Sequence, residues 1–235
     1  MTKSAIYQVG TLTYTRGALA ALFIWLLWGD FCYNLMLQVM PQLLPLFLAR
    51  FDASSLLISI LLVMLPEAVN LVLNPIISTM SDRTRSKWGR RRPYLLFSTP
   101  FLSLFLLLLG WSSEIGAWLH RLVFADVISV NYVILGVAAV LVFSYKVVEI
   151  FCNSVLYYIF NDVVPHQFIG TFMALFRMIG VTAIFLFQRY LMGYADDYMP
   201  WIFTGAAVLY FTGMTAMCLA VKEGEYPPVD PAESK

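Results

Sequence analysis

Residues 82–96 read DRTRSKWGRRRPYLL and hold six of the fifteen lysines and arginines of the 235-residue chain. Hydrophobic residues make up 60% of the chain and charged residues only 12%, whereas about a quarter of the residues in a soluble domain are charged. The composition therefore indicates a membrane protein in which this basic stretch is exceptional. The net charge of +1 gives no overall field that favours nucleic acid as a partner, so lipid is the expected surrounding.

Six apolar segments flank or follow the basic stretch, and each approaches or exceeds the roughly 20 residues that a bilayer-spanning helix needs. They are residues 18–48, 56–80, 94–111, 130–159, 168–191 and 201–221. The sequence thus predicts an all-α membrane protein with a six-helix transmembrane domain over residues 18–221. A short N-terminal tail (1–17) precedes this domain, and a polar tail (222–235) follows it.

The distribution of basic residues predicts the orientation of these helices. With the N-terminus inside, ten lysines and arginines fall on the inner side, and only Arg50 and Arg121 fall in outer loops. Lysine and arginine concentrate on the cytoplasmic side of membrane proteins. We therefore expect a multi-pass protein of the plasma (inner) membrane with both tails in the cytoplasm.

Polar residues recur at helical spacing in four of the six predicted spans, where they are costly unless they face a cavity or a partner helix. They are Asp30, Asn34 and Gln38 in the first, Glu67, Asn70, Asn74 and Ser78 in the second, Lys146, Glu149 and Asn153 in the fourth, and Arg177 in the fifth. The third and sixth spans carry no charged residue. The order polar, polar, apolar occurs twice, which indicates two three-helix repeats, the arrangement that builds half of a major facilitator fold.

Each polar residue has a structural interpretation beside the functional one. Lys146 and Glu149, at positions i and i+3, either neutralise one another or serve a transported ion or substrate. Arg177 either pairs with Asp30 or Glu149 as a structural partner or binds a ligand. The asparagines either join neighbouring helices or contact a ligand.

Chemistry of other classes is not indicated. The three cysteines, Cys32, Cys152 and Cys218, lie inside apolar runs and fit no metal-binding spacing, so neither a disulfide framework nor a metal site is expected. The chain has no His-Glu-x-x-His, no Gly-x-Ser-x-Gly and no phosphate-cradling glycine loop. We therefore expect no enzyme and no cofactor.

The stretch LPEAVNLVLNPIISTMSDRTRSKWGRRRP, residues 65–93, resembles the loop between helices 2 and 3 of the major facilitator superfamily. More narrowly, it is similar to the glycoside–pentoside–hexuronide:cation symporters and the related sucrose transporters. The segments WGDFCYN (28–34) and VVEIFCNSVLYYIFNDVVP (147–165) resemble the first and fourth helices of that family. The resemblance implies a secondary active transporter of a sugar or glycoside that works by proton- or cation-coupled symport.

The resemblance also implies roles for single residues. Asp30 matches an acidic residue of helix 1 implicated in sugar binding, and Arg177 resembles an arginine of helix 5, although it lies about one turn late. The amide side chains on the polar stripes are expected to add contacts to sugar hydroxyls. The implied substrate-binding set is Asp30, Asn34, Asn70, Asn74, Asn153 and Arg177.

Coupling residues follow from the same comparison. Glu149 lies thirteen residues before Asp162, the spacing of the helix 4 acidic residue in the family. A sodium-coupled member has two cation-binding aspartates on helix 2, where this chain has Asn70 and Asn74. Glu67 lies one turn before Asn70 and is hypothesised to bind a proton in place of these aspartates. Glu149 and Glu67 are therefore the expected sites for a co-transported H⁺ or Na⁺.

The basic stretch matches a conformational latch of the superfamily, in which charges pair across the cytoplasmic helix ends and hold the outward-facing state closed inside. The residues that match it are Asp82, Arg83, Gly89, Arg90 and Arg91. In the family, this latch also contacts a helix of the second half of the transporter.

Length separates this chain from the family's transporters, which have twelve helices in two halves with the substrate site between them. The sequence ends after six predicted spans, where the central loop of such a transporter would begin. Three interpretations follow: an N-terminal half that pairs with a second six-helix chain, a homodimer that closes one cavity, or a truncated product. The alternative function is a membrane assembly subunit that keeps the fold without transporting.

Overall fold

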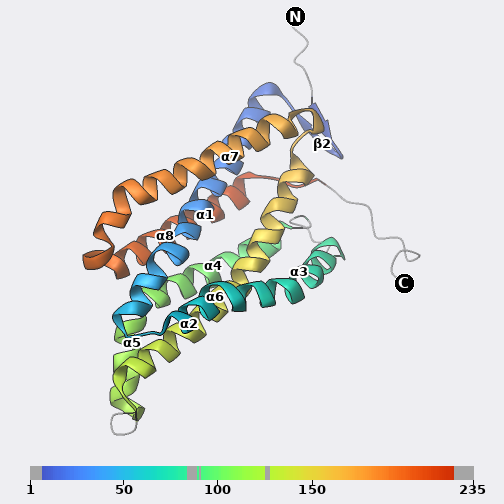
Figure 1. The fold of residues 1–235 in the computed structure, drawn as a ribbon. Coiled ribbons are helices and arrows are strands. Elements are labelled where there is room, and N and C mark those ends of the chain that lie inside the picture. The colour runs from blue at the N-terminus through green and yellow to red at the C-terminus, as the bar shows by residue number, and fades with distance from the viewer. Residues whose placement is uncertain (1–6, 84–88, 90, 125–127, 225–235) are drawn as a thin grey trace, which may run out of the picture.

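The computed structural model describes residues 7–83, 89, 91–124 and 128–224, and within them almost all of the chain is helical (Figure 1). The α-helices are α1 (Arg16–Arg50), α2 (Ser55–Ser59), α3 (Leu65–Arg83), α4 (Arg92–Gly110), α5 (Ser112–Leu119), α6 (Val130–Val163), α7 (Ile169–Leu186) and α8 (Ala195–Ala220). Short π-helical and 3₁₀ turns join some of them: η1 (Ile60–Met64), η2 (His120–Phe124), η3 (His166–Phe168), η4 (Phe187–Leu191) and η5 (Met192–Tyr194). The predicted all-α membrane fold is confirmed.

Every predicted span lies on a helix. In the described part of the chain, five continuous helical stretches are long and apolar enough to cross a membrane. The last of them, His166–Ala220, contains both α7 and α8, which run antiparallel in Figure 1. The last helix, α8, begins at Ala195, but its backbone is non-helical at Tyr198, where it kinks. Asp196 and Asp197 lie in the turn before this kink, and the continuous part of the helix begins after Tyr198, close to the predicted start at residue 201.

The packing of the helices shows the two predicted repeats. In the first repeat, α1 packs against α7 and α8 of the second. In the second repeat, α6 packs in the corresponding way against α3 and α4 of the first, and the third helices, α4 and α8, pack against each other. Exchanging the repeats leaves this pattern unchanged, so the fold is the three-plus-three arrangement of half a major facilitator protein.

The seam between α1 and α8 is held close by one glycine from each helix. A Cβ atom on Gly29 of α1 would lie 2.3 Å from the sulfur of Met217, and one on Gly213 of α8 would lie 2.3 Å from the sulfur of Cys32. Small residues let membrane helices approach closely, and van der Waals packing then supplies the stability that the hydrophobic effect cannot supply in lipid. This seam fixes α1, which carries Asp30 and Asn34.

A β-hairpin precedes the first helix, in a region where the sequence predicted only a tail. Strands β1 (Tyr7–Val9) and β2 (Leu12–Tyr14) pair antiparallel. The ring of Tyr7 packs edge-on against Phe168 at the start of α7, with centroids 5.1 Å apart. The hairpin lies at the end of the bundle where α8 ends and α4 begins, which we call the basic end (Figure 1).

Candidate functional site

The first part of the candidate site is a carboxylate–amide pair on α1. Asn34 lies one turn after Asp30, and its Nδ2 donates to Asp30 Oδ1 at 2.7 Å and to the Asp30 carbonyl at 2.9 Å. Asp30 is fully buried, and its second oxygen, Oδ2, has no hydrogen-bond partner among the described residues. Buried carboxylate oxygens are rarely left without a donor, so this atom is a candidate acceptor for a bound molecule in a conformation that uncovers it.

The second part is a charged cluster at the contact of α6 with α1. Lys146 Nζ lies 3.4 Å from Glu149 Oε2, with side chains only 18% and 12% exposed. The hydroxyl of Tyr33 donates to Glu149 Oε1 at 3.3 Å. The two side chains therefore form the ion pair that their spacing of three residues predicted. Tyr33 follows Asp30 by three residues, so α1 contributes to both parts of the site.

The third part joins α6 to α3. Asn74 is exposed on α3, and its Oδ1 accepts a hydrogen bond from Ser154 of α6 at 2.9 Å. Asn70 and Asn153 are half-buried, and Glu67 is exposed near the start of α3. Asn74 therefore acts as an interhelical link, whereas Glu67 forms no ion pair with any residue that the structure describes.

Arg177 on α7 is exposed and makes no ion pair within the described ranges, so it is not a structural partner of Asp30 or Glu149 here. Tyr157 of α6 lies within electrostatic range of both Arg177 and Asp30. Gly180, one turn after Arg177, faces Asn34, because a Cβ atom there would lie 3.4 Å from Asn34 Oδ1. The α7 arginine and the α1 carboxylate thus both act electrostatically on one tyrosine.

Buried tyrosines behind these groups were not among the predicted site residues. The hydroxyl of Tyr210 on α8 lies 3.0 Å from the sulfur of Cys152, and both residues are fully buried. The Tyr145 hydroxyl is buried without a hydrogen-bond partner in the described part of the chain. The sequence does not mark such a tyrosine as polar, because its one hydroxyl lies on an otherwise apolar side chain within an apolar run. For Tyr145, the available signal was its position immediately before Lys146 on the same helix.

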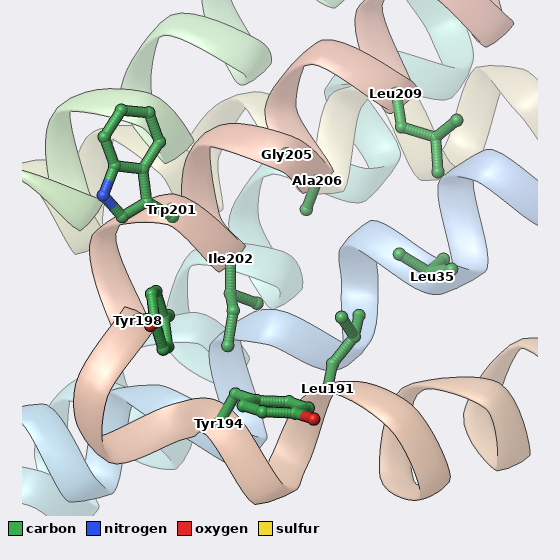
Figure 2. A pocket seen from close by; sticks show the side chains of 9 residues that line it. All are labelled: Leu35, Leu191, Tyr194, Tyr198, Trp201, Ile202, Gly205, Ala206 and Leu209. Atoms are coloured by element: carbon green, nitrogen blue, oxygen red, sulfur yellow. The ribbon is translucent and has the colours of Figure 1, made fainter.

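The molecule also has an apolar pocket, of about 520 Å³, between α8, η4 and α1. Figure 2 shows it lined by aliphatic side chains such as Leu35, with the rings of Tyr194, Tyr198 and Trp201 around it. Ligands rich in hydroxyl groups need several placed donors and acceptors. The Asp30 and Glu149 clusters contain charged and amide groups of this kind, whereas the side chains lining this pocket offer only the hydroxyls of Tyr194 and Tyr198 and the indole N–H of Trp201.

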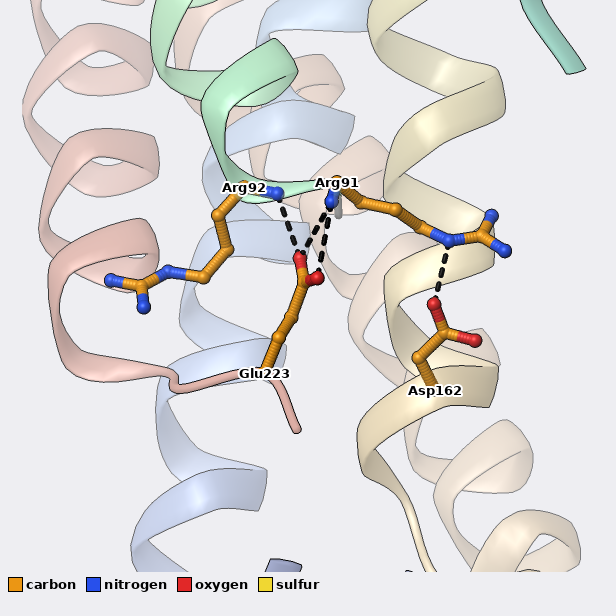
Figure 3. A network of polar contacts seen from close by, with 4 residues as sticks. All are labelled: Arg91, Arg92, Asp162 and Glu223. Carbon is orange, nitrogen blue, oxygen red and sulfur yellow. Dashed lines mark hydrogen bonds and ion pairs between the residues drawn. The ribbon is translucent and has the colours of Figure 1, made fainter. Parts of the chain in front are cut away.

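At the basic end, Figure 3 shows Arg91, the one arginine of the predicted latch whose side chain the structure describes. Arg91 Nε lies 2.6 Å from Asp162 Oδ2 at the end of α6, with side chains 7% and 14% exposed. The Arg91 guanidinium also lies over the ring of Tyr158, 4.5 Å from its centroid. Arg90 and the side chains of Asp82 and Arg83 lie outside the described residues. The described pair joins the first repeat to the second.

Comparison with known proteins identifies related transporters. The family model described as MFS/sugar transport protein matches residues 26–234. The sucrose transport proteins SUT1 of Oryza sativa subsp. japonica and SUC3 of Arabidopsis thaliana are 44% and 39% identical over 46 residues, which is 20% of this chain and 9% and 8% of theirs. The general alpha-glucoside permease of Schizosaccharomyces pombe is 26% identical over 175 residues, 70% of this chain and 30% of the permease.

The chain therefore matches no more than 30% of the length of any of these three relatives. No solved structure matches it. The six apolar helices, the two packed repeats and a family match over most of the sequence agree with one another. The chain is a multi-pass membrane protein and belongs to the MFS/sugar transport protein family.

Proposed function

We propose that the chain is the N-terminal, sugar-binding half of a secondary active transporter for a sugar or glycoside, driven by proton- or cation-coupled symport. The observation that carries this proposal is the free Oδ2 atom of the buried Asp30, held in place by Asn34. Once the site opens to a ligand, such an oxygen accepts a sugar hydroxyl at little cost, because it lacks a hydrogen-bond partner of its own. The names of the relatives, which refer to sucrose and to alpha-glucosides, support a glycoside as substrate.

The exposed charges within the spans support a cavity rather than a lipid-facing surface. Glu67 and Arg177 are exposed and form no ion pair in the described structure. A charge inside a bilayer needs a water-filled cavity or a partner surface. A second six-helix half would enclose these groups.

Glu149 is the proposed coupling group. Its carboxylate lies between Lys146 on the same helix and the Tyr33 hydroxyl of α1. Protonation would remove its attraction for Lys146 and change the contact between α6 and α1, which are the first helices of the two repeats. A proton or cation taken up at Glu149 can in this way alter the site that contains Asp30.

The orientation proposed for the transporter places the basic end in the cytoplasm. Arg91 and Arg92 lie there, together with the N-terminal hairpin and the end of α8. Concentration of arginine on that side supports cytoplasmic termini in a plasma (inner) membrane protein.

The test of substrate binding uses the chain reconstituted in lipid nanodiscs and radiolabelled sucrose and maltose, with mannitol as a non-glycoside control. Removing a hydrogen bond to a charged group costs about 1.5–3 kcal/mol, so Asp30→Asn should weaken glycoside binding roughly ten- to a hundredfold. Asp197→Asn, an equal change at an exposed site in the first turn of α8, should leave it unchanged. Equal binding by all three proteins would contradict the role of Asp30.

The test of transport uses cells that express the chain, with and without an imposed pH or sodium gradient. Uptake of the glycoside that accelerates with one gradient would support symport and name the ion. Uptake that ignores both gradients would contradict symport, and binding without any uptake would favour a non-transporting assembly subunit. Native mass spectrometry on the same preparation distinguishes a homodimer from a monomer that needs a second chain.

A further inference from the structure

The start of α4 lacks a capping side chain from its own turn. Its N-cap residue is Arg91, whose side chain forms no capping hydrogen bond, and Pro93 follows in the first turn. The first backbone N–H groups of a helix have no partner within the helix and need an acceptor from elsewhere. Serine, threonine, aspartate and asparagine usually supply it locally.

At α4 the acceptor comes from the far end of the chain. Glu223 lies just after α8, 131 residues beyond Arg92, and its Oε1 accepts the Arg92 N–H at 2.7 Å. The Arg91 N–H lies 3.1 Å from each of the two carboxylate oxygens of Glu223 (Figure 3). A negative charge at this position also interacts favourably with the positive end of the helix dipole.

The turn before α4 is shaped around this carboxylate. Gly89 has φ +108°, a conformation that side chains other than glycine rarely adopt. A Cβ atom on Gly89 would lie 2.7 Å from Glu223 Oε2 and 2.8 Å from its Cδ. Glycine is thus required here both for the backbone conformation and for the space that Glu223 occupies.

The capped residues are the ones that join three helix ends. Arg92 Nε donates to the carbonyl oxygen of Cys218 in α8 at 2.8 Å, while the Arg91 side chain pairs with Asp162 at the end of α6. Gly224, the next residue after Glu223, packs against the N-terminal hairpin, since a Cβ atom on it would lie 3.0 Å from Thr11 Oγ1. The position of Glu223 is therefore linked to α4, α6, α8 and the hairpin.

We propose that Glu223 is a positioning residue that caps α4 from the end of α8 and thereby holds the Arg91 guanidinium against Asp162. When the end of α8 moves away, the cap is lost, the turn at Gly89 is released and the Arg91–Asp162 pair weakens. The segment after α8 thus controls a charge pair between the two repeats. The proposed role of Glu223 involves only the basic end and does not depend on which molecule the protein carries.

The first measurement is hydrogen–deuterium exchange of the full chain in nanodiscs, followed in peptides that cover residues 89–96. Loss of an N-cap raises the opening of a first helical turn by roughly fivefold, so Glu223→Ala should accelerate exchange there by about that factor. Glu223→Gln, which keeps one acceptor oxygen without the charge, should have a smaller effect. Glu114→Ala, at an exposed site in α5, is the matched control and should not change exchange in this region.

The second measurement separates positioning from simple stabilisation. Asp162→Asn should lower the thermal midpoint of the wild-type chain, but it should lower that of Glu223→Ala by less than half as much, because Arg91 is no longer held in place. Additive shifts in this double-mutant cycle would contradict the positioning role. Unchanged exchange over residues 89–96 in Glu223→Ala would overturn the cap itself. If Glu223→Ala does not fold, the same cycle is run with Glu223→Gln, and the same outcomes decide.

Discussion

The substitution Gly213→Ala, which adds a single methyl group, tests the close packing of α1 and α8 directly. In the structure a Cβ atom on this residue would lie 2.3 Å from Cys32 Sγ and 2.9 Å from Cys32 Cβ. Favourable contact distances between heavy atoms are about 3.5–4.0 Å. Because Cys32 is fully buried, Gly213→Ala forces α1 and α8 apart by more than about 1 Å or pushes Cys32 from its position.

The size of the effect follows from two opposing terms. Inserting a methylene into a packed core costs about 1–3 kcal/mol, and the seam has little room to relax, because Gly29 and Met217 meet in the same way along it. Alanine in place of glycine recovers up to about 1 kcal/mol of helix propensity. Taking the upper part of the packing range, we expect a net loss of about 1–2 kcal/mol, which is roughly 2–8 °C in Tm for a protein of this size.

The matched control lies in the same helix. Gly205 of α8 has open space around its Cβ position, so Gly205→Ala should leave the Tm unchanged or raise it. The assay is the fraction of protein that remains monodisperse by size-exclusion chromatography after heating. Cys32→Gly combined with Gly213→Ala should recover part of the loss, because it removes the two atoms that the new methyl group meets. Equal midpoints for Gly213→Ala and Gly205→Ala would refute the close seam.

Three further predictions concern charged groups. Glu149→Gln should abolish the acceleration of glycoside uptake by the coupling-ion gradient while binding persists, because the carboxylate proposed to bind the ion is replaced by a neutral amide; uptake with and without the gradient checks this. Lys146→Met should lower the Tm by several degrees, since removing one partner of a largely buried pair leaves the other charge uncompensated. Asp196→Asn should shift the Tm by less than about 2 °C, although its Oδ1 lies 2.8 Å from Arg50 Nη2, because these side chains are 89% and 40% exposed and surface ion pairs contribute little.

The spans and the repeats were predictable because the signals for them are local. A run of about 20 apolar residues identifies a membrane helix without knowledge of its neighbours, and the alternation of polar and apolar helices follows the repeat. The hairpin over residues 7–14 was not predicted, because two strands of three residues each give no periodicity that can be distinguished from a tail. It is stable here through its contact with Phe168, which lies far along the chain.

The candidate site was predictable in its residue types but not in its pairings. Helical spacing placed Asn34 one turn after Asp30, and the structure joins them by a hydrogen bond. Spacing within one helix does not predict the hydrogen bonds from Tyr33 to Glu149 and from Ser154 to Asn74. Those contacts depend on how α1, α3 and α6 pack. The functional roles of these residues stay predictions until binding is measured.

The contacts of the basic stretch involve residues that are distant in the sequence. The charge of Arg91 and Arg92 predicts only the cytoplasmic side of the membrane, and the family resemblance adds a latch that includes Arg91. In the folded chain the two arginines have separate tasks, since one guanidinium faces Asp162 of α6 and the other faces the Cys218 carbonyl of α8. Their backbone N–H groups donate to Glu223, a residue that the sequence marked only as part of a polar tail.

A lysine in place of Arg91 or Arg92 would keep the charge and the orientation but would lose the planar group with several donors that these contacts use. If Arg91→Lys and Arg92→Lys leave the Tm and the exchange of residues 89–96 unchanged, positive charge alone accounts for the stretch. If either quantity changes, the contacts of the guanidinium groups stabilise this end of the fold beyond the effect of charge.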